Sequence, residues 1–353
     1  MHGQSPFIDT AAVEARDAWF RSRERGRLQD ITVEETWRRT ARVLATVESV
    51  RPAAEYEAAL MMAFASWRLL LDERVMATAC TSAAAWPTSD LVAVLNASMF
   101  VRERFSTRAR FDLVAFGAMA ELAVKALDSA AMLGSGPPPP TYRLRVGIVG
   151  LADALALLGM RYNSPAGCAH AARIGRALAE GCFRGAVRSS RECDACREPS
   201  SAMLELATKR GLPAELLDDA RRHGLRHGSL TAITSQPRLA LFANNVANAL
   251  DPLSGEDCSH VITTSGQSRL VRSSGYALTV RRMQSANTTA SQESIETNLP
   301  ASASIAIRQA IQPWIDEPIT YALPDMRAAI ATADACEPTP KTDPVLLHRG
   351  VGG

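Results

Sequence analysis

The stretch that most constrains the fold is residues 143–182, RLRVGIVGLADALALLGMRYNSPAGCAHAARIGRALAEGC. Apolar residues recur in both halves at intervals of three and four, which is the spacing of amphipathic helices. Gly159 is a natural C-terminal stop for a first helix, and Ser164-Pro165 is typical of the cap and first position of a second. The stretch therefore predicts two helices joined by a tight turn. Their expected buried residues are Ile148, Leu151, Leu155 and Leu158 on the first helix and Ala171, Ile174, Leu178 and Cys182 on the second.

Composition narrows the class of protein. Of 353 residues, 47% are hydrophobic and 22% are charged, so the chain can bury a substantial core as one large domain or two ordinary ones. Lys and Arg number 39 against 37 Asp and Glu, a balance that gives no overall field to attract nucleic acid or a membrane surface. Seven cysteines, an odd number, fit a reducing compartment better than a disulfide framework. MHGQSPFIDT shows no secretory signal and no apolar run is long enough to span a membrane, so we expect a cytoplasmic protein.

Two further helices are expected near the N-terminus. Thr32 and Glu35 have the spacing of a capping box, ahead of a helix that presents Trp37 to the core. Pro52 begins another helix, whose large apolar residues recur at helical spacing as far as Trp67. These aromatic residues are expected in the core.

The C-terminal third predicts less regular structure. Residues 260–264 and 276–280 are β-branched or alternating, which predicts two short strands. Residues 284–304 are rich in Ser, Thr, Asn and Gln and predict a flexible loop. The tail beyond Cys336 is expected to be disordered.

Four blocks of the chain resemble the large catalytic chain of ribonucleotide reductases. They are residues 30–38 (DITVEETWR) with 67–81 (WRLLLDERVMATACT), residues 90–128, residues 145–167, and residues 225–252. Residues 305–315 also resemble a late helix of the family. In the third block, RVGIVGLADALALLG followed by RYNSPAG is similar to the helical segment after the family's active-site loop, and the closest match is to the adenosylcobalamin-dependent class. The resemblance implies part of a ten-stranded α/β barrel, most of whose central region is missing after residue 81.

The block at residues 225–252 resembles the family's substrate loop, written G-x-R-N-x-x-x-x-T-x-A-P-T-G-T-x-S and ending in S-S-G-x-E-P. In the family, small and hydroxyl residues there let the backbone and a helix N-terminus bind substrate phosphates. Here SQPR stands at residues 235–238 in place of P-T-G-T, and ANA at residues 247–249 in place of S-S-G. The resemblance therefore implies a remnant of a phosphate site, with Thr234, Ser235 and Arg238 as its candidate residues.

The family's chemistry depends on a radical cysteine in an N-x-C-x-E motif and on a further pair of redox cysteines. The sequence contains neither feature: Cys80 lies in no such motif, and Cys336 stands alone near the C-terminus. No residue can be assigned as catalytic. No cofactor is established, and adenosylcobalamin is expected only if the family's activity is retained.

A metal site is an alternative. Cys193 and Cys196 form a CxxC pair, and His223 and His227 form an HxxxH pair that would share one face of a helix and complete a zinc site. Glycines next to both histidines oppose a helix there, and the reductases carry no metal in this region. A loop with two thiols is therefore the competing interpretation.

Together these features predict a mainly α protein with a small β part, in the α+β class. Its expected regions are an N-terminal helical region (1–81), a region similar to an incomplete reductase α/β barrel (82–335) and a flexible tail (336–353). Because the front strands of the barrel are missing, its sheet cannot close, and helices or a partner chain must cover the open edges.

Three functions stay open at this point. The first is a catalytically inactive, reductase-like protein of deoxynucleotide metabolism that acts as a binding or regulatory partner. The second is an adenosylcobalamin-dependent ribonucleotide reductase active only with a partner chain, and the third is a zinc-binding helical protein. The first is favoured, because packing segments persist where the active-site loop is missing. Its expected partners are an intact reductase chain or a second copy of this chain, with a nucleotide as candidate ligand and with neither nucleic acid nor a membrane.

Overall fold

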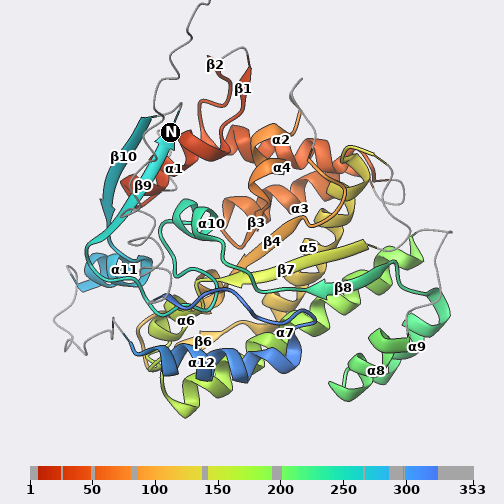
Figure 1. Cartoon of the computed structure of the whole chain (residues 1–353). Coiled ribbons are helices and arrows are strands. Elements are labelled where there is room, and N and C mark those ends of the chain that lie inside the picture. The colour runs from red at the N-terminus through yellow and green to blue at the C-terminus, as the bar shows by residue number, and fades with distance from the viewer. Residues whose placement is uncertain are drawn as a thin grey trace, which may run out of the picture. The chain divides into compact units, whose positions relative to one another are not determined.

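The computed structural model describes residues 7–24, 27–48, 52–80, 86–136, 142–192, 201–264, 267–285, 297 and 299–324. Residues 1–321 form one compact unit, and residues 322–353 form a second, of which only 322–324 are described. The predicted tail, most of the loop over residues 284–304, and Cys193, Cys196 and Cys336 therefore lie outside the described residues. The first unit is an α+β structure in which helices predominate, as the sequence predicts (Figure 1).

The helices are α1 (Thr10–Ala15), α2 (Val33–Ala45), α3 (Ala53–Ala65), α4 (Glu73–Thr78), α5 (Leu113–Leu133), α6 (Leu151–Leu157), α7 (Pro165–Arg191), α8 (Ser201–Lys209), α9 (Ala214–His223), α10 (Pro237–Phe242), α11 (Tyr276–Ser285) and α12 (Ala301–Ile311). A π-helical segment at Arg16–Phe20 follows α1, and short 3₁₀ turns lie at Ala97–Phe100 and Gln312–Trp314. The strands are β1 (Arg23–Glu24), β2 (Arg27–Leu28), β3 (Leu69–Leu71), β4 (Val92–Asn96), β5 (Val101–Arg102), β6 (Arg110–Phe111), β7 (Tyr142–Val149), β8 (His227–Thr231), β9 (Cys258–Thr264) and β10 (Gln267–Ser273).

The central sheet has the strand order β3-β4-β7-β8. β4, β7 and β8 are parallel, and β3 is antiparallel to β4. β3 and β4 lie on either side of residue 81, so the strand pairing joins the N-terminal helical region to the rest of this unit. Within the described residues this sheet does not close into a barrel.

The first helix expected over residues 143–182 is wrong in its N-terminal part, where the structure has the strand β7. Residues 142–149 form a strand because β4 and β8 bond to both of its edges and its apolar residues are buried on both faces. A doubly buried strand is apolar almost throughout, so its pattern can match helical spacing as well. The helix begins only after Gly150, which adopts a left-handed φ of 68°.

Most of the rest of that prediction is confirmed, although Leu158 caps α6 and is only partly buried. Gly159, with a φ of 72°, follows α6, and the Ser164 side chain caps α7 with Pro165 at its first position. The four apolar residues expected on the second helix, Ala171, Ile174, Leu178 and Cys182, are fully buried. In Figure 1, α7 lies beside α5 on one face of the sheet.

The N-terminal helices build an aromatic core with α10. The capping box of Thr32 and Glu35 is present at the start of α2, as predicted. Trp67 lies 5.1 Å, ring centroid to ring centroid, from both Trp37 and Phe242, and Phe20 stacks on Phe242 at 4.3 Å. These contacts tie α2 and the segment after α3 to the chain that follows β8.

Of the two strands expected in the C-terminal third, one is present and the other is not. Residues 258–264 form β9, which pairs in antiparallel register with β10 at residues 267–273. Residues 276–280 are not a strand, because they begin α11, whose second residue, Ala277, donates its backbone N–H to the buried Asp153. The late helix is confirmed but starts earlier, at Ala301.

The outer edge of β8 is covered by the chain itself. The carboxylate of Asp316 accepts the backbone N–H groups of Leu230 (2.8 Å) and Thr231 (3.0 Å), and Glu317 donates its own N–H to the Thr231 carbonyl (3.2 Å). Arg210 holds Asp316 from the other side at 2.6 Å. The expected need to cover an open edge is thus met here by a short segment after α12.

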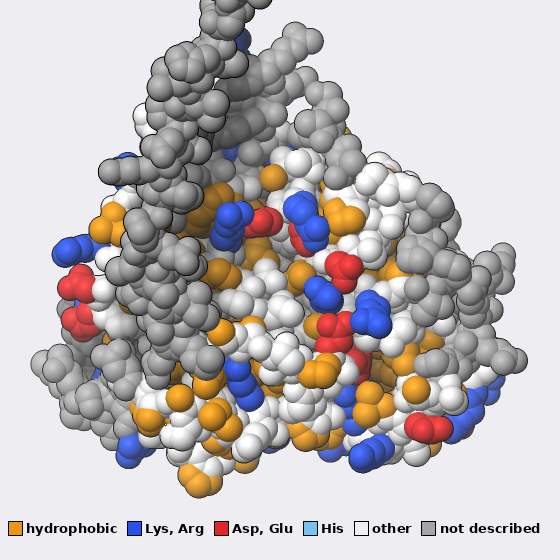
Figure 2. Space-filling model, viewed as in Figure 1, with side chains coloured by type: hydrophobic (Ala, Val, Ile, Leu, Met, Phe, Trp, Pro, Cys, Tyr) orange, Lys and Arg blue, Asp and Glu red, His pale blue; other side chains and the backbone are white. Residues whose placement is uncertain are grey.

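Charges on the visible surface are mixed. On the face shown in Figure 2, basic and acidic side chains are interspersed. Arg145 contacts both Asp90 (3.0 Å) and Glu317 (3.7 Å). In the part of the chain that the structure describes, no helix is long and apolar enough to cross a membrane.

Candidate functional site

The carboxyl ends of β4, β7 and β8 meet at one edge of the sheet, which is where open parallel sheets bind ligands. Asn96 ends β4 and is fully buried, with its Oδ1 accepting the Ser98 hydroxyl at 2.7 Å. Gly150 follows β7, and a Cβ there would lie 2.7 Å from the same Asn96 oxygen. The backbone therefore packs closely at this edge. Glycine is required at position 150, because any other side chain would be strained by the left-handed φ and would collide with Asn96.

The candidate phosphate residues follow β8 at this edge, but their polar groups bond within the protein. Thr234 and Ser235 are half-buried, and the Thr234 hydroxyl accepts a hydrogen bond from Gln236 Nε2 at 2.9 Å. Arg238 points elsewhere: it pairs with Glu73 of α4 at 2.9 Å, and its guanidinium lies 5.0 Å from the centroid of the Trp19 ring. The structure therefore does not direct the side chains of Thr234, Ser235 and Arg238 toward one point.

Asn248 is the residue that closes this loop, and the sequence analysis gave it no role. Its Oδ1 accepts the backbone N–H of Gln236 at 2.6 Å. Its Nδ2 donates to the Ser235 hydroxyl at 3.1 Å and to the Asp251 carboxylate at 2.9 Å. The amide of Asn248 thus engages one N–H group and one hydroxyl that could otherwise bind an anion, and the Asp251 carboxylate lies beside them.

Asp153 bonds to the 243–251 loop at the carboxyl edge of the sheet and to α11. It is fully buried in α6 and accepts the backbone N–H groups of Ala247 (2.6 Å) and Ala277 (2.9 Å). Burial raises its pKa to about 6, although the backbone hydrogen bonds act to lower it. One carboxylate thereby joins α6, the 243–251 loop and α11. The sequence signal for this role is a single acidic residue within the apolar run LADALALLG at residues 151–159, which indicates a carboxylate that is buried with the run.

The histidines proposed for a metal site are separated. His223 ends α9 and is half-buried, and Gly224, with a φ of 76°, breaks the helix directly after it. His227 lies in β8, fully buried, with its Nε2 2.6 Å from the Asp128 carboxylate. The shared helical face expected for the HxxxH pair is therefore wrong. In the described ranges, no group of three or more His, Cys, Asp or Glu side chains could hold a metal ion.

The Asp128–His227 pair is part of a buried network. Tyr142 donates its hydroxyl to Asp128 at 2.6 Å. Burial acts to raise the pKa of Asp128, but His227, together with hydrogen bonds from Tyr142 and Ser189, lowers it below its ordinary value. The carboxylate is therefore ionised inside the protein and is held by α5, β7, β8 and α7.

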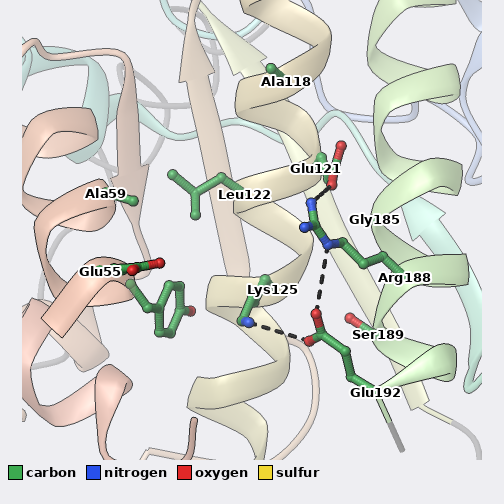
Figure 3. Close-up of a pocket in the computed structure, with 11 residues that line it drawn as sticks. Glu55, Ala59, Ala118, Glu121, Leu122, Lys125, Gly185, Arg188, Ser189 and Glu192 are labelled. Carbon is green, nitrogen blue, oxygen red and sulfur yellow. Dashed lines mark hydrogen bonds and ion pairs between the residues drawn. The ribbon is translucent and has the colours of Figure 1, made fainter. Parts of the chain in front are cut away.

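A cavity of about 330 Å³ opens between α3, α5 and α7 (Figure 3). Ala59 and Leu122 form part of its apolar lining, and Lys125 and Arg188 are its cations. Lys125 lies 3.3 Å from Glu192 and 4.9 Å from the centroid of the Tyr56 ring. It is a second candidate binding site, and the sequence analysis gave no indication of it, because its lining is drawn from three helices far apart in the sequence.

Comparison with protein-family models and with curated protein sequences finds no match to this chain. What the molecule can do therefore rests on its own geometry and on the sequence resemblance.

Proposed function

We propose that the chain is a reductase-like protein without catalysis of its own, which acts in deoxynucleotide metabolism as a binding or regulatory partner of an intact ribonucleotide reductase. In this proposal β4, β7 and β8, with α5 to α9 between them, are the retained part of the family's barrel. The 82–335 region then takes the place of the family's catalytic region, and a partner binds outside the β8 edge, which Asp316 and Glu317 already cover.

The observation that carries the proposal is the closed loop at the carboxyl edge of the sheet. In the family, hydroxyl and glycine residues keep this loop open to substrate phosphate, as the resemblance implies. Here Asn248 bonds to Gln236, Ser235 and Asp251, and Arg238 is drawn to Glu73. The N–H of Gln236, the hydroxyl of Ser235 and the guanidinium of Arg238 are therefore engaged in holding the fold.

The thiols support the same conclusion. Cys168 and Cys182 both lie on α7, roughly 21 Å apart at 1.5 Å per residue. Cys182 is fully buried, which raises the pKa of its thiol well above the ordinary value and disfavours the thiolate. Cys80 is exposed after α4, and Cys258 lies in β9. A radical site needs thiols gathered around one substrate, whereas these four are distributed over three parts of the fold and the two on α7 are far apart.

Adenosylcobalamin does not fit the residues present. The loop that resembles the family's substrate loop bonds to itself through Asn248, and Asn96 and Gly150 at the same edge of the sheet are packed against each other. We therefore assign no chemical step to this group.

The proposal is tested by mixing the purified full chain with an intact adenosylcobalamin-dependent reductase chain. We expect the two to co-elute in size-exclusion chromatography and the reductase's turnover or nucleotide response to change. A lack of association, together with an unchanged reductase, would contradict the proposed role. Turnover of a ribonucleotide by this chain alone, with adenosylcobalamin and a dithiol, would contradict the loss of catalysis, most directly if Cys80→Ser abolished it.

The role of the closed loop has its own test. Asn248→Ala frees the N–H of Gln236 and the hydroxyl of Ser235, and we expect it to lower the free energy of unfolding by about 1–2 kcal/mol. If the loop is a closed phosphate site, inorganic phosphate will stabilise the variant more than it stabilises the unmodified chain at matched ionic strength. An equal effect of phosphate on both proteins would show that Asn248 closes nothing.

A further inference from the structure

The β5–β6 hairpin and the residues beside it carry a local excess of positive charge. The whole chain has a formal net charge of only +2, so its composition does not reveal this excess. Arg102 and Arg110, both exposed, are directly opposed in the two strands, which places their side chains on one face. The arginine patch, as we call it, consists of the exposed and half-buried arginines of the hairpin and of the two positions that lie against it: Arg68, Arg102, Arg104, Arg108, Arg110 and Arg281.

Two acids, Asp112 and Glu103, offset part of this charge. Asp112 lies 3.4 Å from Arg102, and Glu103 pairs with Arg110. Both arginines are exposed, so solvent screens these two pairs. The other four arginines of the patch take part in no ion pair with a residue that the structure describes. The patch therefore has more guanidinium groups than the chain has carboxylates beside it.

The hairpin keeps two features that cost stability. Like charges directly opposite each other in an antiparallel pair are destabilising, and Arg102 and Arg110 stand in that relation. Glu103 and Phe105 have left-handed φ angles of 50° and 56°, which residues other than glycine rarely adopt. Such strain is concentrated at functional sites. A bound carboxylate would relieve the repulsion between the two arginines.

Contacts with α6 and α11 hold the hairpin in place. Phe105 donates its backbone N–H to the carbonyl of Leu157, the last residue of α6, at 2.8 Å. Arg104 donates from Nη1 to the hydroxyl of Tyr276, the first residue of α11, at 3.0 Å. A surface that is fixed before binding loses little conformational entropy when a partner binds. The patch is therefore pre-organised for an anionic partner.

The surroundings of the arginines indicate which kind of anion fits. Val114, in the first turn of α5, is 85% exposed two residues after Asp112. A protein segment can cover this side chain with an apolar one, whereas a phosphate backbone cannot. Phe105 is half-buried and Arg281 lies over its ring, 6.0 Å from the centroid, so this ring is not an open platform for a nucleic-acid base. The planar guanidinium fork also matches a carboxylate in a bidentate arrangement.

We propose that the arginine patch is a docking surface for an acidic segment of a partner protein, whose carboxylates bind the arginines and whose apolar side chain covers Val114. The inference goes beyond the proposed function. It does not require the partner to be a ribonucleotide reductase, because it rests on the charge and exposure of the hairpin alone.

The test is fluorescence anisotropy of a labelled peptide rich in Glu and Asp, with two leucines, titrated with the full chain. We expect saturable binding that weakens as salt is added, and no binding of the same peptide with Gln and Asn in place of its acids. Arg108→Glu should raise Kd about tenfold, because it removes a favourable charge and adds an unfavourable one. Its control is Arg38→Glu, an exposed arginine of α2, which lies far from β6 in Figure 1 and should leave Kd nearly unchanged.

Val114 distinguishes a protein segment from other anions. Val114→Ser should raise Kd for the peptide about threefold, whereas Val261→Ser, at a position 63% exposed on β9, should not. Both Arg108 and Val114 are exposed, so their variants should keep the circular dichroism spectrum of the unmodified chain. An oligodeoxythymidine and vesicles of phosphatidylcholine with phosphatidylserine serve as competing polyanions. The proposal is overturned if the peptide shows no saturable binding, if Arg38→Glu weakens binding as much as Arg108→Glu does, or if either polyanion binds the unmodified chain more tightly than the peptide.

Discussion

The buried carboxylate of Asp153 makes the stability of this protein depend on pH in a direction opposite to that of most acidic residues. Its pKa is about 6 in the folded chain against 3.8 in the unfolded chain. A raised folded pKa means that the contribution to stability is fully present below about pH 3.8 and is lost as pH rises through about 6. The shift corresponds to about 3 kcal/mol in total, of which roughly 1.4 kcal/mol falls between about pH 5 and pH 7.5.

The perturbation that isolates this effect is Asp153→Asn, which keeps the size of the side chain and removes its titration. The asparagine oxygen can accept one of the two N–H groups from Ala247 and Ala277, but its amide faces the other, so the variant is less stable at low pH. As pH rises, the unmodified chain loses stability that the variant does not. The difference in unfolding free energy between them should therefore shrink by about 1.4 kcal/mol from pH 5 to pH 7.5.

The assay is urea unfolding followed by circular dichroism at a series of pH values, on both proteins. All other titrating groups, including Asp30 and Asp128 with their lowered pKa values, are common to the two chains and cancel in the difference. A difference that stays constant across this range would refute the reasoning. If the variant does not fold, carbon-13 NMR titration of the Asp153 carboxyl in the unmodified chain decides the same question, with a midpoint near 6 expected.

Two further predictions follow from buried contacts and can be checked by the same unfolding measurements. His227→Ala leaves the charge of Asp128 buried without its main partner and should cost about 3 kcal/mol or more, whereas His223→Ala should change stability by less than about 0.5 kcal/mol. Gly147→Ala places a Cβ 2.7 Å from a backbone oxygen after β8 and should cost about 1–3 kcal/mol, whereas Gly255→Ala, which meets nothing within 4 Å, should be nearly neutral. Equal effects within either pair would contradict the packing described for that position.

Local signals in the sequence predicted local structure well. The capping box of Thr32 and Glu35 and the Ser164-Pro165 cap are formed by bonds within one helical turn, so the residues that make them are adjacent in the sequence. β7 was mistaken for a helix because its second half, residues 146–149, is buried on both faces and has no alternating pattern, although Tyr142, Arg143 and Leu144 do alternate between buried and exposed. The start of α11 was mistaken for a strand because its position is fixed by Asp153, 124 residues earlier in the chain.

The candidate site was less predictable, because its contacts join distant parts of the chain. Asp128 and His227 are 99 residues apart, and Arg238 and Glu73 are 165 residues apart. Sequence spacing can place a histidine or an arginine on an element, but it does not reveal which buried acid that element will meet. The charged lining of the cavity between α3, α5 and α7 was invisible for the same reason.

The positions where this chain departs from the reductase loop are also positions where its side chains stabilise the fold. Asn248 stands where the resemblance expects a serine, and it makes three hydrogen bonds; Arg238 stands where it expects a threonine, and it joins α10 to α4 and to Trp19. Active sites keep polar groups unpaired and backbones open for a ligand, which costs stability. Under the proposed function, this chain is released from that requirement and can bond those groups internally. In that case the substitutions that would prevent substrate binding also stabilise the scaffold, and reversing Asn248 should lower the stability of the fold while it frees groups that could bind phosphate.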